Sequence, residues 1–214
     1  MQTFEAATVI ADFFLKQFTD VCEPGRCRVA GGMLRKKPYV HDLEFVLQPI
    51  AKAPPPVFGI KAKDQPKTLL DKKLNDLETI EFLYFVQGAD RNKKYWVNME
   101  RFSLPPDDEF KLDLWITVPP AQYGVNMVIR TGPGSDQNNF SKWIVTPRAS
   151  GGALPDGYRV KHCAVWRVDQ LDAKDQPFEG ESPLLMPTAE DFLDFVGVTA
   201  EPEDRRADWG RWIR

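Results

Sequence analysis

The spacing of apolar residues predicts four helices. In the N-terminal segment they recur with the period of an α-helix, at Val9, Ile10, Phe13, Phe14 and Phe18. This pattern predicts a helix from about residue 4 to 20. Similar spacing predicts helices over 69–77 and 139–145. A fourth helix is expected from Thr188 to about Val196, because Thr188 and the Asp three residues later approximate a capping box.

Runs of β-branched and aromatic residues predict the strands. They lie at 26–30, 43–47, 81–86, 95–97, 110–118 and 158–167. The third and fourth runs are joined by a Gly- and Asn-containing segment, which predicts a hairpin. Residues 22–25 are expected to form a turn. The mixture predicts an α+β protein, and Pro119-Pro120 predicts a boundary between residues 1–119 and 120–214.

Composition places the chain among ordinary globular proteins. Its hydrophobic content is 43%, and no apolar run approaches the roughly 20 residues of a membrane span. We therefore expect no membrane partner. Cys22, Cys27 and Cys163 lack the spacing of a metal site, so free thiols in a reducing compartment are expected. No signal peptide is apparent, and we expect a cytoplasmic, non-secreted protein.

The net charge and the local distribution of charge favour different partners. The net charge of −3 and the pI of about 5.5 argue against a strong, sequence-independent grip on DNA. Three local basic clusters point the other way, around Lys61–Lys73, Arg91–Lys94 and Arg205–Arg214. Each alone is compatible with a solvated face. Together they slightly favour a polyanionic partner.

One motif carries most of the candidate chemistry. Asp42 and Glu44 lie two residues apart at the start of a predicted strand, so both side chains project to one face. Adjacent like charges on a half-buried strand need a cation between them, and oxygen ligands suit Mg²⁺ or Mn²⁺. Upstream, the Gly31-Gly32 pair could present main-chain N–H groups to a phosphate. The alternative is a surface Asp and Glu after an ordinary turn.

This motif resembles the signature of the nucleotidyltransferase superfamily. An apolar-Gly-Gly segment, Arg35, and Asp42-Leu43-Glu44 stand in the order of that signature, and the chain looks most like the palm and thumb of family X (polymerase beta-like) DNA polymerases. The resemblance continues through four further segments: 111–115, 123–125, 130–132, and 191–195 with 201–205. It implies a mixed-sheet palm over 1–119 and a small α/β thumb-like subdomain over 120–214.

The resemblance also implies phosphoryl transfer with two Mg²⁺ or Mn²⁺ ions. Asp42, Glu44 and Asp113 would hold these ions as the catalytic carboxylates. Asp113 could take the proton of the attacking hydroxyl, and Lys111 could offset the charge around it. Nucleotide contacts are implied for Gly31, Gly32, Arg35, Arg130, Gly132 and Asn139.

The expected partners are a nucleoside triphosphate and a DNA primer-template, bound by a monomer. Since the resemblance covers only palm and thumb, weak binding of gapped DNA is expected. The acidic pI favours a second hypothesis, a nucleotidyltransferase with an RNA, protein or small-molecule acceptor. A third hypothesis is a non-catalytic nucleic-acid-binding relative. The presence of all three carboxylates and of Arg35 counts against it. The resemblance further predicts a cis peptide bond between Gly132 and Pro133.

Overall fold

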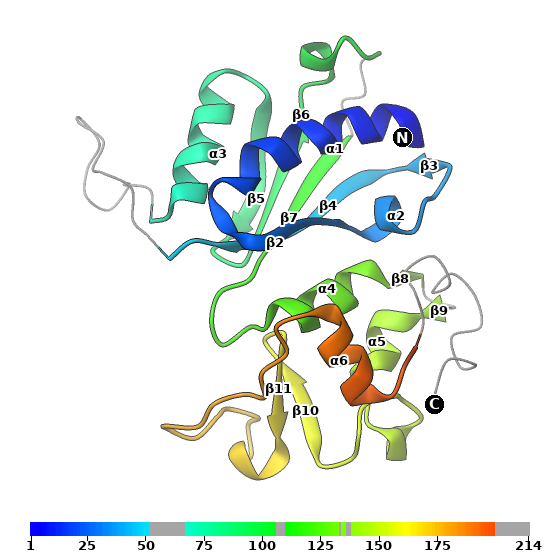
Figure 1. The fold of residues 1–214 in the computed structure, drawn as a ribbon, viewed down its shortest axis with the longest axis vertical. Coiled ribbons are helices and arrows are strands. Elements are labelled where there is room, and N and C mark those ends of the chain that lie inside the picture. Colours follow the sequence, from blue (N-terminus) through cyan, green and yellow to red (C-terminus); the bar gives the residue numbers. More distant parts are fainter. Residues whose placement is uncertain (52–66, 106–109, 133, 136–137, 200–214) are drawn as a thin grey trace. The chain divides into compact units, whose positions relative to one another are not determined.

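The computed structural model describes residues 1–51, 67–105, 110–132, 134–135 and 138–199 (Figure 1). The chain divides into two compact units. The first unit comprises Met1–Val29 and Lys37–Ile116, and the second comprises Ala30–Lys36 and Thr117–Arg214. This division groups Ala30–Lys36 with the later part of the chain, unlike the division predicted at residue 119. The palm and thumb assignments stay predictions.

The first unit is built on a five-stranded mixed sheet. In spatial order its strands are β2 (Cys22–Ala30), β4 (Asp42–Pro49), β7 (Lys111–Ile116), β6 (Asn92–Val97) and β5 (Leu83–Ala89). β4 and β7 are parallel, whereas β6 is antiparallel to both of its neighbours. The other elements are α1 (Phe4–Thr19), α3 (Leu69–Thr79), the pair β1 (Gln2–Thr3) and β3 (Tyr39–Val40), and the 3₁₀ helix η2 (Met99–Phe102).

The core of the first unit lies between the sheet and α1 (Figure 1). Every second residue of β4 from Leu43 to Leu47 is fully buried, and the Phe18 ring of α1 meets Phe45 edge-to-face at 5.9 Å. A Thr68–Asp71 capping box starts α3. The Asp71 carboxylate also lies 2.6 Å from the ammonium of Lys93 on β6. Both helices therefore attach to the same face of the sheet.

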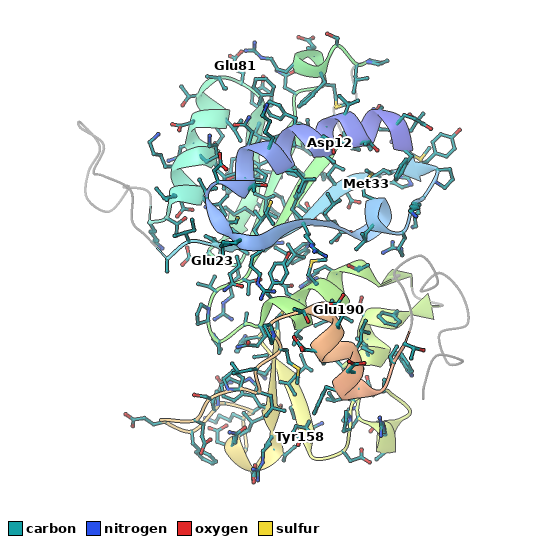
Figure 2. All side chains as sticks on the ribbon, viewed as in Figure 1. Asp12, Glu23, Met33, Glu81, Tyr158 and Glu190 are labelled. Carbon is teal, nitrogen blue, oxygen red and sulfur yellow. The ribbon has the colours of Figure 1, made fainter. Side chains whose placement is uncertain are left out.

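The second unit is mainly helical. Its elements are α2 (Gly31–Leu34), α4 (Tyr123–Thr131), β8 (Gly134–Ser135), β9 (Asn138–Asn139), α5 (Phe140–Ile144), η3 (Arg148–Ser150), β10 (Tyr158–Lys161), β11 (Ala164–Arg167), η4 (Val168–Gln170) and α6 (Ala189–Val196). One apolar cluster joins α4, α5 and α6. Gly124 of α4 lies directly against the backbone of Thr188, so these helices approach closely. Tyr158, labelled in Figure 2, packs edge-to-face on Phe195 at 5.0 Å.

The predicted helices and strands are found at or near their expected positions, whereas the helices α2 and α4 were not predicted. Two predicted segments also differ in conformation. Residues 22–25 belong to β2, and the predicted turn survives only as a bend where Gly25 has φ +71°. The run 158–167 is a hairpin, because His162 and Cys163 both take positive φ between β10 and β11. No helix in the described part of the chain combines the length and hydrophobicity needed to cross a lipid bilayer.

Some predictions fall outside the described residues. These are the basic segment from residue 61, the Gly132–Pro133 bond, and the 201–205 motif with the basic tail that follows it. Elsewhere, the peptide bond between Pro119 and Pro120 is cis.

Candidate active site

The three predicted carboxylates lie on the same face of two neighbouring parallel strands. In the register of β4 and β7, Asp42 pairs with Lys111 and Glu44 pairs with Asp113. Register partners in a parallel pair point to the same side of the sheet, and residues two apart on one strand also share a side. Asp42, Glu44 and Asp113 therefore project from one face. This face is the one opposite α1, because Phe45, which points to the other side of β4, packs against Phe18 of α1.

Asp113 is the most buried of the three carboxylates, with 5% of the residue exposed. Its Oδ2 accepts a hydrogen bond of 2.6 Å from the ammonium of Lys94, its ladder partner on β6. Its Oδ1 is buried and accepts no hydrogen bond. A buried carboxylate oxygen without a donor is costly, so this atom has unused capacity for a proton or a cation.

The partly buried environment of Asp42 favours its protonated form. Burial is the main cause that raises the pKa of Asp42 above its ordinary value, and the nearby negative charge of Asp113 adds to it. The positive charges of Lys94, His41 and Lys111 act in the opposite direction without cancelling the shift. The carboxylates of Asp42 and Asp113 thus repel each other across the β4–β7 pair.

Lys94, rather than Lys111, makes the ion pair with Asp113. Lys111 is in register with Asp42 and lowers the pKa of that carboxyl, while its ammonium lies 4.5 Å above the Trp96 ring. The predicted role of Lys111 beside Asp113 is therefore taken by Lys94. Lysines 93 and 94 diverge, because successive residues on β6 point to opposite faces and Lys93 reaches Asp71 of α3.

The donor set of this face suits a hard cation. The free Oδ1 of Asp113 and the repulsion between Asp42 and Asp113 are what a divalent ion would relieve. In the described part of the chain, no three His, Cys, Asp or Glu side chains are already grouped so that they could hold a metal ion. The Lys94 ammonium instead carries the positive charge beside Asp113.

Arg35 lies in the second unit and ties α2 to α4. Its guanidinium is buried, and Nη1 donates to the carbonyl oxygens of Thr131 and, at 3.2 Å, Gly132. These carbonyls lie at the C-terminal end of α4, where a positive charge is stabilised by the helix dipole. The contact gives Arg35 a structural role. Its contact with a triphosphate stays a prediction.

The two glycines of the motif begin the one-turn helix α2. Gly31 has φ +60°, a conformation that side-chain-bearing residues rarely adopt, and its carbonyl accepts from the Arg35 amide at 3.3 Å. Gly32 is the second residue of this turn. The Gly31-Gly32 turn expected from the sequence is therefore the start of a short helix that positions Arg35 for its contact with α4.

The other predicted nucleotide contacts lie around the end of α4. Arg130 is in its last turn, and Gly132 caps it where an added Cβ would collide with the Phe140 ring. Asn139 caps α5, its Oδ1 accepting from the Lys142 amide at 2.8 Å. Helix capping and close packing therefore explain why a glycine stands at 132 and an asparagine at 139. The three lie in the second unit and the carboxylates in the first.

A row of side chains that sequence reasoning missed crosses the carboxylate face. Asp42, Lys111, Trp96 and Tyr84 are successive register partners on β4, β7, β6 and β5. Tyr84 is 47% exposed at the far end of the row. The alternation within each strand was readable from the sequence. The register that aligns the four strands was not.

Comparison with models of known protein families finds no match, and a search of curated proteins finds no relative.

Proposed function

We propose that the chain is a metal-dependent nucleotidyltransferase, most like a minimal family X DNA polymerase. The observation that carries the proposal is the placement of Asp42, Glu44 and Asp113 on one face of two adjacent parallel strands. An apolar-Gly-Gly segment preceding such a set is the combination expected of this chemistry. Two Mg²⁺ or Mn²⁺ ions would be held by these carboxylates.

In the proposed reaction, Asp113 receives the proton of the attacking hydroxyl. Its Oδ1 accepts no hydrogen bond, so it can take a proton without first breaking one. Lys94 holds the other oxygen and fixes the orientation of the carboxylate. Asp42 and Glu44 would position the triphosphate through the ions. When bound, the ions supply positive charge that neutralises the transferring phosphoryl group.

Two aromatic side chains, the exposed Tyr84 and the half-buried Trp96, favour an acceptor that carries a base. Tyr84 and Trp96 belong to the same cross-strand row as Asp42, and stacking on an aromatic side chain contributes about 1–3 kcal/mol per base. Stacking would serve a DNA or an RNA end equally, and the resemblance to family X DNA polymerases is what favours a DNA primer end as the acceptor. The net charge of −3 favours the alternative, a nucleotidyltransferase with a small-molecule, protein or RNA acceptor.

Primer extension tests the proposal. The wild-type chain is incubated with a labelled primer, nucleoside triphosphates and Mg²⁺ or Mn²⁺, with and without a template. Asp113→Asn is compared with Asp76→Asn, which alters an exposed aspartate on α3. We expect extension by the wild type and by Asp76→Asn, and a loss of at least a hundredfold in Asp113→Asn. Transfer to other acceptors without primer extension would support the alternative. Absence of transfer to any acceptor would favour the hypothesis that the chain is a non-catalytic nucleic-acid-binding protein.

A further inference from the structure

Two aromatic side chains stand next to each other on the carboxylate face of the sheet. Trp96 of β6 and Tyr84 of β5 are direct cross-strand partners, in the row that begins at Asp42. Direct partners on antiparallel strands have Cβ atoms about 4.5–5.5 Å apart, so the two rings form one surface. Tyr84 is 47% exposed and Trp96 is half-buried. We refer to these two residues as the aromatic pair.

The charged groups closest to the aromatic pair are lysines. Neither β5 nor β6 contains an acidic residue. Lys94 points to the same face as Trp96, since the two residues are two apart on β6. The ammonium of Lys111 lies 4.5 Å from the centre of the Trp96 ring. The β5–β6 half of this face therefore combines exposed aromatic surface with positive charge.

Tyr84 is oriented by the chain itself. Its hydroxyl accepts a hydrogen bond of 3.1 Å from Nδ2 of Asn98, and the same amide donates to the carbonyl oxygen of Glu81 at 2.9 Å. A side chain that is already held in one orientation loses less conformational entropy when a ligand stacks on it. The aromatic pair is therefore suited to binding a flat group.

The surroundings of the aromatic pair favour nucleic acid over an apolar protein surface. In the next row, Lys94 pairs with Gln87, so polar side chains border the two rings. Bases stack on aromatic side chains, and lysines attract the phosphates that join them. Inside a duplex, the faces of each base are covered by its neighbours. An unpaired strand leaves its bases free to stack on protein rings.

We propose that the aromatic pair binds the unpaired end of a single-stranded nucleic acid. This inference deepens the proposed function and rests on it for the position of the reacting end near Asp42. Neighbouring strands are about 4.8 Å apart, so Trp96 and Tyr84 lie about 10 and 14 Å from Asp42 along the row. A stacked strand rises about 3.4 Å per nucleotide. About four nucleotides therefore span the distance from Asp42 to Tyr84.

Oligonucleotide binding tests the proposal without nucleotide transfer. Fluorescence anisotropy of labelled oligothymidylate of about ten nucleotides is measured with Mg²⁺ and without nucleoside triphosphates. We expect the single strand to bind at least about fivefold more tightly than a blunt duplex of the same length or a labelled dinucleotide. Oligouridylate of the same length shows whether the site prefers RNA or DNA, and binding of either single strand supports the proposal.

Neighbouring residues of β5 provide matched variants. Tyr84→Leu removes a ring from the carboxylate face, whereas Phe85→Leu removes a similarly exposed ring from the opposite face, where Phe85 packs on Tyr95. We expect Tyr84→Leu to weaken binding at least about fivefold and Phe85→Leu to change it less than about twofold. Tyr84→Phe keeps the ring and should bind within about threefold of the wild type. Trp96→Leu is a second, independent variant and should weaken binding as Tyr84→Leu does.

The outcomes separate this inference from the proposed activity. Equal losses in Tyr84→Leu and Phe85→Leu, tighter binding of the blunt duplex, or no saturable binding of either single strand would overturn the inference. If the wild type also extends a primer, the proposed activity stands without it. Binding that depends on Tyr84, in a chain that transfers nucleotides to no acceptor, would support the inference and overturn the activity alone.

Discussion

The Lys94 ammonium and the Asp113 carboxylate lie 2.6 Å apart across β6 and β7, on the face that carries Asp42 and Glu44. The lysine side chain is 29% exposed and the aspartate side chain 7%. A lysine thus supplies the positive charge that the sequence led us to expect from a metal. This pairing decides how the carboxylates respond to substitution.

Replacing Lys94 should make the stability of the protein depend on a bound metal ion. Lys94→Met leaves Asp113 buried without its ion pair, so we expect a loss of about 2 kcal/mol in the free energy of unfolding in metal-free buffer. Mn²⁺ or Mg²⁺ should restore part of this loss. The control Lys72→Met removes only the exposed pair with Asp76 and should cost less than about 0.5 kcal/mol. Urea unfolding with and without metal measures the free energy of unfolding of both variants. If metal does not change the stability of Lys94→Met, the carboxylates do not form a cation site.

Asp42→Asn and Asp113→Asn should both abolish nucleotide transfer, yet differ in stability. Asp42 is half-buried near another negative charge, so Asp42→Asn should leave the metal-free protein as stable as before or slightly more stable. Asp113→Asn loses the ion pair with Lys94 and should be destabilised by about 1–3 kcal/mol. Thermal melting in a chelator distinguishes them. Transfer within tenfold of wild type in either variant would remove that residue from the active site.

The Asp71–Lys93 pair predicts a pH-dependent contribution to stability. Burial opposes ionisation of Asp71, but the Lys93 ammonium and hydrogen bonds from Thr68 outweigh it and hold the pKa of Asp71 below its ordinary value. The contribution is therefore complete above about pH 4, the range of the unfolded carboxyl, and is lost as the pH falls through the folded value. Asp71→Asn should cost about 2 kcal/mol at pH 7.

The same substitution should cost less at a pH below the ordinary range of the unfolded carboxyl, because part of the stabilisation by the Asp71 charge is then lost. Urea unfolding at pH 7 and near pH 3 tests this, with Asp76→Asn as an exposed control on α3. An Asp71→Asn penalty that is equal at both values would show that the charge of Asp71 is not what stabilises the helix start.

Arg35 should behave as a structural residue of the second unit. Arg35→Met removes a buried donor from the carbonyls that end α4, and we expect a loss of about 2–3 kcal/mol. Arg130→Met, in the last turn of the same helix, should cost less because Arg130 is only half-buried. Thermal melting and nucleotide titration separate the two effects. Wild-type stability with weakened nucleotide binding would make Arg35 a ligand contact instead.

Gly124 should tolerate no side chain. A Cβ there would meet the Thr188 carbonyl, which is backbone and cannot rotate away, so Gly124→Ala should cost about 1–3 kcal/mol and loosen α4 from α6. Gly180→Ala is the control. No atom would meet its Cβ, and only the positive φ of 85° would oppose it. Equal costs at both positions would argue against close packing of the two helices.

Local patterns in the sequence predicted the longer elements of the first unit and α6, because each depends on neighbouring residues, but they did not predict α2 or α4. The period of α1 and the Thr188–Asp191 capping box of α6 are examples. The carboxylate face could be predicted only in part. That Asp42 and Glu44 share a face follows from one strand, but the choice of Lys94 over Lys111 for Asp113 depends on the pairing of β6 with β7. Arg35 and the carbonyl of Thr131 are 96 residues apart, and no local pattern connects them.

The strand β5 ends the sheet in the described part of the chain, and its side chains from Tyr84 onward are exposed. An apolar edge of this kind is a template on which a second molecule could add a strand. The pairing of β5 with β6 shifts register between Phe85 and Gln87. Such an irregularity twists the edge and interrupts its row of free hydrogen-bonding groups. We expect an incoming strand to lose its alignment at this shift, which would oppose growth of the sheet into a fibre.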